Sequence, residues 1–450
     1  MSRAPEDGFS ASRPRRRRPG VAPTQHARTG SSLALKLTPI RVWESKDSGI
    51  VDRLIAGPAR RNSRIEARVR RIVADVRERG DTALMEYARQ LDGLTGPVEI
   101  TRTEIRRAAR TVPADVGDAI RLAARNIRTV ARKQVPTGWR VSTVPGVRIE
   151  QRVTPLERVG CYVPGGRYPL PSSLLMTAIP ARVAGVREII AVCPRPDATV
   201  LFAAGVAGVD RLFRIGGAHA VAALACGTRT VPRVDKIVGP GNAYVAAAKA
   251  LVSRECAIDF FAGPSEIVVV SASGNPGWIA ADLIAQAEHD PDARAILLTP
   301  SRRLAEAVAG ECDRLLPGDG TARDALARNG GIVVTRSIAE AIALSQQMAP
   351  EHVVCDDEAV AARLTAAGTV FVGSWSAQAL GDYVTGSNHV LPTGGAARAR
   401  GGLGAVDFVR VSNVQRISSR GVRRIGDAAV TLAQAEGLTA HAASIRVRFS

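Results

Sequence analysis

Histidine is scarce in this chain, and the few histidines stand near other side chains that can hold a cation. Gln286 and His289 are three residues apart, a spacing that places both on one face of a helix. A carboxamide oxygen and an imidazole so placed can chelate one cation, although the end of any helix can carry this pair by chance. Asp382 and His441 supply further oxygen and nitrogen donors. Two imidazoles with oxygen donors suit zinc or its neighbours in the divalent series.

A second reactive pair, Glu351 and His352, stands directly after Pro350 at the start of a β-branched run. In open parallel sheets ligands bind beyond the carboxyl ends of the strands. Taken alone, the pair is therefore explained more simply as a capping glutamate with a surface histidine. As catalysts, the two side chains would offer one base for an alcohol proton and a second base for a water.

Three glycine-rich turns adjoin apolar runs, at residues 163–166, 215–217 and 238–242. Turns of this kind let backbone amides approach a phosphate at the start of a helix. None has the G-x-G-x-x-G spacing of a dinucleotide-binding turn, and an ordinary tight turn would explain each one singly.

Two periodicities divide the chain into the elements that must position these residues. Residues 61–134 have the apolar spacing of amphipathic helices. From residue 145 onward, short β-branched runs alternate with alanine-rich helices, which predicts two successive α/β units with parallel sheets. Beyond Gly404 we expect helix again. The predicted strands are 189–193, 212–215, 237–238, 267–270, 296–298, 332–334, 352–355 and 370–372.

Composition restricts the class of protein. The formal charge is +19, but only five of the 61 basic residues are lysines, and arginines scattered along helices indicate solvated faces more than a nucleic-acid surface. No apolar run is long enough to span a membrane. The six cysteines stand singly, as in reduced cytoplasmic proteins. We expect residues 1–35 to form a disordered basic tail, with an organelle transit peptide as the alternative.

Together the motifs resemble the histidinol dehydrogenase family, from about Ile40 to the C-terminus. The resemblance rests on seven stretches in the family's order: Cys161-Tyr-Val-Pro-Gly-Gly, Val238-Gly-Pro-Gly-Asn-Ala-Tyr, Phe261-Ala-Gly-Pro-Ser-Glu, Gln286-Ala-Glu-His-Asp, Pro350-Glu-His, Gly386-Ser-Asn-His-Val-Leu-Pro-Thr and Ala435-Glu-Gly-Leu-Thr-Ala-His.

The resemblance implies an α/β fold of two incomplete Rossmann-like parallel-sheet units with helical N- and C-terminal segments, assembled as a homodimer. After the tail we expect an N-terminal arm at 36–57, a first unit made of 58–161 and 266–403, a second unit at 162–265, and a helical dimerisation segment at 404–450. No nucleic-acid or membrane partner is expected.

The resemblance also implies a role for individual residues. One zinc ion per subunit would be bound by Gln286, His289, Asp382 and His441, with His441 coming from the other chain. Glu351 and His352 would be the acid/base pair, and NAD would contact Tyr162, His219 and Asn242. Substrate would contact the four zinc ligands and His352, together with Ser265, His389 and Glu436.

One position departs from the family pattern, which reads Gly-Gly-Ala-Gln-Ala where this chain has Gly216-Gly-Ala-His219-Ala. Histidine can still donate a hydrogen bond, but its reach and charge differ from those of glutamine. The cofactor contact at His219 is therefore the least secure of those implied.

The activity implied is oxidation of histidinol to histidine, through an enzyme-bound aldehyde and with two NAD. The alternative within the same class is a zinc and NAD dehydrogenase for another small alcohol, such as a sulfonated propanediol, because the turn at 165–169 is also similar to such relatives. From a different class, the basic tail would suit a nucleic-acid-binding protein that shares an enzyme fold.

Overall fold

The computed structural model describes residues 40–56, 63–165, 169–261, 263–316 and 318–449. The predicted basic tail, residues 1–35, and most of the variant turn at 165–169 lie outside the described residues. In the described ranges the chain forms two six-stranded sheets and one three-stranded sheet, which we call sheets A, B and C below.

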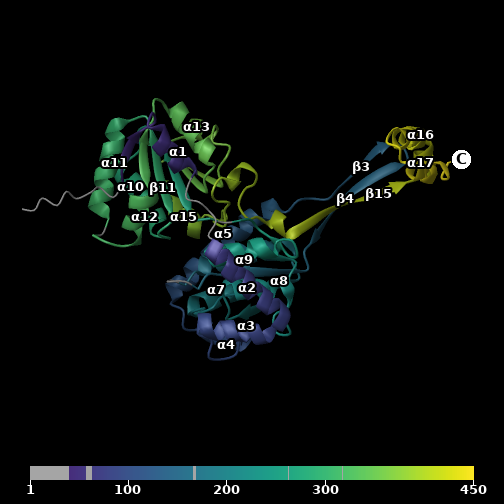
Figure 1. Cartoon of the computed structure of the whole chain (residues 1–450), viewed down its shortest axis with the longest axis horizontal. Coiled ribbons are helices and arrows are strands. Elements are labelled where there is room, and N and C mark those ends of the chain that lie inside the picture. The colour runs from purple at the N-terminus through teal and green to yellow at the C-terminus, as the bar shows by residue number, and fades with distance from the viewer. Residues whose placement is uncertain (1–39, 57–62, 166–168, 262, 317, 450) are drawn as a thin grey trace, which may run out of the picture. The chain divides into compact units, whose positions relative to one another are not determined.

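Sheet A is parallel throughout, with the strand order β1-β12-β11-β10-β13-β14. Its central strands are buried along their whole length because helices cover both faces. Helices α10 to α12 pack on one face, and α1 and α13 pack on the other (Figure 1). The strands are β1 (Val42–Glu44), β10 (Glu266–Val270), β11 (Arg294–Thr299), β12 (Gly331–Val334), β13 (His352–Cys355) and β14 (Thr369–Val372). The helices are α1 (Ser48–Ala56), α10 (Pro276–Ala287), α11 (Arg302–Leu315), α12 (Thr321–Asn329), α13 (Ile338–Met348), α14 (Glu358–Ala361) and α15 (Gln378–Tyr383).

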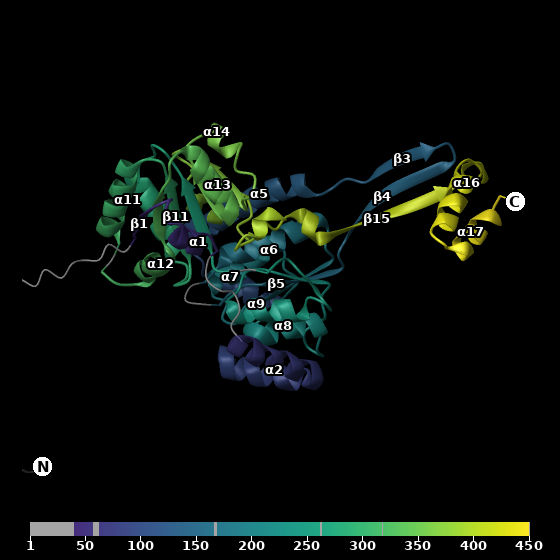
Figure 2. The same ribbon diagram turned by 45° about the horizontal axis from the view of Figure 1, so that its top comes forward.

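Sheet B has the order β2-β7-β6-β5-β8-β9 and is parallel except where β2 pairs with β7. Helices α5 to α7 cover one face, while α2, α3, α8 and α9 cover the other (Figures 1 and 2). The strands are β2 (Glu99–Ile100), β5 (Arg158–Tyr162), β6 (Glu188–Val192), β7 (Arg211–Phe213), β8 (Lys236–Val238) and β9 (Ala257–Ile258). The helices are α2 (Ser63–Arg79), α3 (Asp81–Tyr87), α4 (Arg102–Ala109), α5 (Ala114–Gln134), α6 (Pro171–Ala184), α7 (Ala198–Ala207), α8 (Gly217–Cys226) and α9 (Ala243–Val252), with a π-helical turn at Ala88–Asp92.

Sheet C is antiparallel, in the order β15-β4-β3, and α16 follows β15 directly (Figure 2). It consists of β3 (Trp139–Val144), β4 (Val147–Pro155) and β15 (Val409–Ile417), and the chain then forms α16 (Ser419–Ala435) and α17 (Thr439–Arg446). Gly146 turns β3 into β4 with φ 96°, and a Cβ there would lie 2.5 Å from the Gly421 nitrogen at the start of α16. The expectation that 404–450 is all helical is therefore wrong, because β15 pairs with β4 over nine residues.

The sheets divide the chain differently from the boundaries we expected. The expected cut between 161 and 162 falls inside β5, which hydrogen-bonds to both β6 and β8, and a strand cannot be shared between two units. Residues 63–134 belong with sheet B, since their helices form its core. Residues 42–56 are part of sheet A and not an arm, because β1 pairs with β12 and α1 packs against α13.

All eight predicted strands are present, each within a residue or two of its expected bounds. The helix expected to carry Gln286 and His289 is α10, which ends at Ala287 and so contains only Gln286, and the Asn275 side chain caps its start by accepting from the Gly277 and Trp278 amides. No helix in the part of the chain that the structure describes is long and apolar enough to cross a membrane. All six cysteines are free thiols.

Candidate active site

Glu351 and His352 lie at the amino-terminal edge of sheet A, where β13 begins beside β10. They are only 5% and 4% exposed. A capping glutamate with a surface histidine would be far more accessible, so that simpler explanation is wrong for this pair. The site is thus built at the edge of the sheet opposite to the one that usually binds ligands.

The backbone of Glu266, the first residue of β10, holds both side chains. Its N–H donates to Oε2 of Glu351 at 2.9 Å, and its carbonyl lies 3.2 Å from Nδ1 of His352. Because a carbonyl can only accept, Nδ1 of His352 carries the proton and Nε2 keeps its lone pair. The Gln378 side-chain nitrogen lies 3.3 Å from that Nε2 and donates to it. His352 is thereby oriented as a base.

Burial moves the two pKa values in opposite directions. It raises the pKa of Glu351 well above its usual value, and the neighbouring charges of Glu266 and Asp382 raise it further. It also lowers the pKa of His352 to about 4. A neutral imidazole and a carboxyl with a raised pKa are suited to proton transfer near neutral pH.

A buried ion pair that the sequence did not single out supports this edge. Nη1 of Arg294 lies 2.7 Å from Oε2 of Glu266, and the two side chains are 6% and 1% exposed. The Glu266 carboxylate also accepts from the Gly394 amide. The Glu266 backbone thus positions Glu351 and His352, while the Glu266 side chain is itself held by Arg294 and the Gly394 amide.

Arg294→Met should destabilise the protein by about 3 to 5 kcal/mol, because it leaves the Glu266 carboxylate buried without its cation. The free energy of unfolding from urea titration measures this. The matched control is Arg314→Met, which breaks the solvent-exposed pair with Glu311 and should leave the free energy of unfolding almost unchanged. Equal effects from the two variants would contradict a supporting role for the buried pair.

Of the implied metal donors, Gln286 lies in α10, His289 lies two residues beyond the end of that helix, and Asp382 lies in α15, which contacts α10. Oε1 of Gln286 is buried and has no hydrogen-bond partner among the described residues, an arrangement that leaves it free to bind a cation. Nδ1 of His289 lies 3.2 Å from the Gln286 carbonyl and donates to it, which leaves the lone pair of Nε2 available to a cation. The residues present therefore fit a divalent cation.

His389 and Ser265 join the same site. Nδ1 of His389 lies 2.8 Å from the Asp382 carbonyl, so its Nε2 is also unprotonated, and burial lowers its pKa. The charges of Asp382, His389 and His289 all act on the pKa of His352, which places these groups in one electrostatic environment. The Ser265 side chain lies close enough to Glu351 to oppose the rise in the pKa of its carboxyl.

His441 and Glu436 lie elsewhere. His441 is an exposed residue of α17, and Glu436 is the exposed C-cap of α16. Within the described ranges, no three His, Cys, Asp or Glu residues form a group that could hold a metal ion. Of the expected site residues, His441 and Glu436 therefore do not join the others within a single chain.

Gln378 is a site residue that the sequence analysis missed. It is 1% exposed, and its side-chain nitrogen donates to Oδ2 of Asp382 at 2.8 Å as well as approaching His352. Its Oε1 has no partner among the described residues. The sequence does contain one indication of this role: Gln378 and Asp382 are four residues apart, a spacing that aligns them on one face of a helix.

The implied NAD contacts lie at the carboxyl edge of sheet B, the position where parallel sheets usually bind nucleotides. Tyr162 ends β5, His219 lies in the first turn of α8, and Asn242 caps α9 by accepting from two backbone amides. Gly239 has φ 118°, and a Cβ there would stand 2.2 Å from the Tyr162 carbonyl. This close approach of the two backbones requires glycine at position 239.

A second buried ion pair holds one of these turns. Lys249 and Asp259 are in contact and almost fully buried. Lys249 donates to the Gly239 carbonyl at 2.9 Å, while Asp259 accepts from the Gly239 amide at 2.8 Å. The turn after β8 is therefore fixed from both sides.

A family model for histidinol dehydrogenase matches residues 56–449, which include both candidate edges. The chain belongs to the histidinol dehydrogenase family. A histidinol dehydrogenase of Aromatoleum aromaticum is 45% identical over 413 residues, covering 88% of this chain and 94% of the relative. One from Geobacter sulfurreducens is 47% identical over 401 residues, covering 85% and 93%. The crystal structure of histidinol dehydrogenase from Elizabethkingia anophelis superposes with a TM-score of 0.86 at 32% identity, covering 91% and 98%.

Membership of the histidinol dehydrogenase family makes this chain an oxidoreductase, and the structural match confirms the predicted α/β class. The family match includes the segment with His441 and Glu436.

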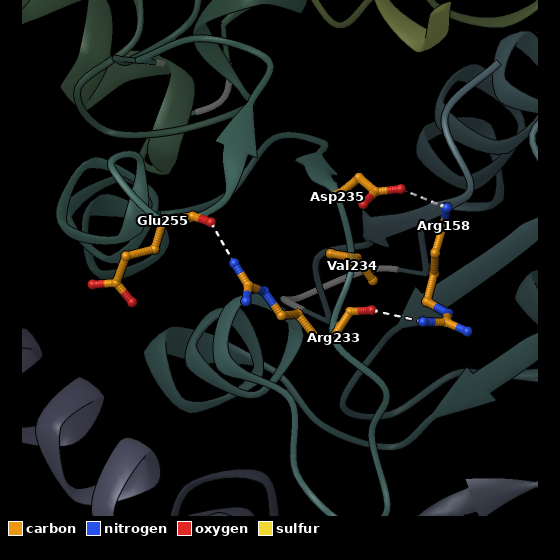
Figure 3. A pocket seen from close by; sticks show the side chains of 5 residues that line it. All are labelled: Arg158, Arg233, Val234, Asp235 and Glu255. Carbon is orange, nitrogen blue, oxygen red and sulfur yellow. Dashed lines mark hydrogen bonds between the residues drawn. The ribbon is translucent and has the colours of Figure 1, made fainter. Parts of the chain in front are cut away.

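A pocket of this histidinol dehydrogenase family member lies away from both candidate edges. Its volume is about 390 Å³, and it opens at the amino-terminal edge of sheet B (Figure 3). Its polar groups bind one another: Arg158 donates to the Arg233 carbonyl, Arg233 donates to the Glu255 carbonyl, and Asp235 accepts from the Arg158 amide. It contains no candidate site residue.

Asp282, one helical turn before Gln286, should make stability depend on pH. Burial alone raises its pKa to about 6, so the folded state holds this proton more tightly than the unfolded chain. The resulting loss of stability grows as the pH rises from about 4 through 6. Asp282→Asn should therefore raise the free energy of unfolding by about 1 to 3 kcal/mol at pH 8 and by less at pH 5. Asp292→Asn, an exposed residue beyond the same helix, is the control. A benefit that does not depend on pH would contradict this assignment.

Proposed function

We propose that this enzyme oxidises histidinol to histidine through an aldehyde that stays bound, passing two hydrides to two NAD in turn. The observation that carries the proposal is the buried Glu351–His352 pair, whose pKa values move apart beside an unpaired Gln286 oxygen. Family membership supplies the substrate, since the similar relatives are named for it.

We assign the metal to zinc, held by Gln286, His289 and Asp382 together with His441 of a second chain. A cation there would supply a fixed positive charge that binds and orients the nitrogens of the substrate. The support is the donor chemistry: one unpaired amide oxygen, one carboxylate, and the imidazole of His289, whose Nδ1 is already directed to a carbonyl. His389, Ser265 and Glu436 would complete the contacts to substrate.

In the first oxidation, Nε2 of His352 accepts the hydroxyl proton of the substrate as the hydride leaves its carbon. The nitrogen is suited to this because Nδ1 is directed to the Glu266 carbonyl and because its lowered pKa keeps the ring neutral. Gln378, which donates to the same nitrogen, must yield this position to the substrate.

In the second oxidation, Glu351 takes a proton from the water that adds to the aldehyde carbon, while His352 returns the proton of the first step to the aldehyde oxygen. The resulting diol then gives up its hydride, and His352 takes the proton of one diol hydroxyl. A carboxyl buried with a raised pKa can hold that proton near neutral pH. The same closed site keeps the aldehyde from escaping. NAD would bind at the carboxyl edge of sheet B, near Tyr162 and Asn242.

We further propose a cytoplasmic homodimer, with each C-terminal segment completing the partner's site. In the described residues, sheet C and the helices after it expose apolar side chains that would require a cover. Their exposed fractions run from 43% to 71%: Trp139, Val141, Val411, Ile417, Leu432, Leu438 and Val447. A second copy would bury them and would bring Glu436 and His441 to the metal. The free thiols agree with a reducing compartment.

Cofactor stoichiometry tests the reaction directly. The zinc-loaded enzyme, given limiting histidinol and excess NAD, should produce two reduced cofactors per substrate consumed. One per substrate would indicate a simple alcohol dehydrogenase. No turnover of histidinol, with turnover of another small alcohol, would favour the alternative substrate, which the family comparisons do not support.

A further inference from the structure

His219 binds a carboxylate from a distant part of the chain. Its Nε2 lies 2.8 Å from Oδ2 of Asp92, the last residue of the π-helical turn that follows α3. The same oxygen accepts from the Gly216 amide at 2.8 Å. Asp92 therefore links the imidazole to the turn at which α8 begins.

This turn has little freedom once these bonds are made. Gly217 has φ 56°, and a Cβ on Gly216 would lie 2.7 Å from Pro194. The Gly217 amide donates to the hydroxyl of Tyr162 at 3.0 Å, so both glycine amides are already used by protein groups. Asp92 thus binds the amide of Gly216, the N-cap residue of α8, which has no side chain of its own to cap the helix.

His219 itself is closed to a ligand. It is 0% exposed, its ring stacks on Tyr87 at 6.0 Å between centroids, and its Nδ1 has no partner among the described residues. Because a carboxylate accepts, Nε2 carries the proton, and the buried Nδ1 offers only a lone pair. No donor of a bound cofactor reaches that nitrogen without opening the packing around it.

We propose that His219 is a positioning residue for the cofactor: it holds Asp92 against the Gly216–Gly217 turn and does not touch NAD. The inference rests on the proposed binding of NAD at this edge of sheet B. A positioning role also explains why histidine can replace the glutamine that the family has at this position. In both side chains Nε2 is three bonds from Cβ, so a glutamine amide can make the same bond to Asp92.

A double-mutant cycle tests the proposal, with NAD affinity of the purified full-length enzyme measured by calorimetry. His219→Leu and Asp92→Asn should each weaken NAD binding roughly tenfold, the size expected for losing a hydrogen bond to a charged group. The double variant should be no weaker than the weaker single variant, since both break one linkage. His219→Gln should bind NAD within about threefold of the parent. The KM for NAD should change while kcat and the KM for histidinol do not.

Hydrogen exchange of the peptide that contains Gly216 and Gly217 gives a readout that needs no cofactor. Exchange should be faster in His219→Leu and Asp92→Asn, and unchanged in His219→Gln and in the control Tyr87→Phe, which keeps the stacked ring. If His219→Leu does not fold, His219→Asn replaces it, because its shorter amide cannot reach Asp92.

Additive losses in the cycle, or weaker NAD binding with unchanged exchange, would overturn the proposal, since both indicate a direct contact between His219 and the cofactor. If the parent enzyme binds no NAD, the proposed function fails instead. The exchange data still decide whether His219 holds the turn.

Discussion

Glu351→Gln is expected to stop the reaction at the aldehyde. Glutamine keeps the shape of the side chain and can still accept from the Glu266 amide, so the position of His352 should be preserved. It cannot take the proton of a water, which the second oxidation requires and the first does not. We expect the first hydride transfer to remain within about tenfold of the parent, and the second to slow by about 10² to 10⁴.

Single-turnover absorbance of reduced NAD measures both steps. The parent should release two reduced cofactors per active site, and the variant should release one quickly and the second very slowly. The control is Glu358→Gln on the exposed first turn of α14, which should leave both phases unchanged. Equal slowing of the two phases in Glu351→Gln would rule out a separate role for this carboxyl in the water step.

Mixing two inactive variants is expected to restore activity if the metal site is shared between chains. His289→Ala removes a donor on the α10 side, whereas His441→Ala removes one from the C-terminal segment. Each homodimer should lose metal and at least about a hundredfold in activity, more than the loss of an outer-shell partner costs. A hybrid dimer contains one site with neither defect. Random mixing should therefore recover roughly a quarter of the parent activity.

A second mixture is the control for this experiment. His441→Ala and Glu436→Ala both lie on the C-terminal segment, so every site in their hybrid lacks one residue, and no activity should return. Metal content by mass spectrometry should follow activity in the first mixture. If the His289 and His441 variants do not rescue each other, while each still dimerises, both donors belong to the same chain.

The local elements could be predicted from the sequence because their signals lie in neighbouring residues. A run such as 267–270, β-branched and without polar residues, suits a strand with both faces buried. Asn275 followed by Pro276 marks the start of α10, and Gln286 lies in its last turn, with His289 two residues beyond the end of the helix. The seven motifs identified the family for the same reason, since each is a short continuous stretch.

The division into units could not be predicted, because pairing between strands is settled by partners far apart in the chain. Nothing local in 42–44 distinguishes an arm from the edge strand beside β12. The expected cut through β5 failed because its neighbours β6 and β8 are recognised only once the sheet forms. β15 was taken for helix because its pairing with β4 is separated by more than 250 residues.

The sequence by itself determined which residues can do the chemistry and which family the chain resembles. Only the tertiary structure decided how those residues are charged and oriented. The pairing of β13 with β10 puts the Glu266 backbone against Glu351 and His352, and burial there moves their pKa values apart. The bond between Asp92 and His219 spans 127 positions. Such effects depend on desolvation and on long-range contacts, which a linear pattern of residue types does not specify.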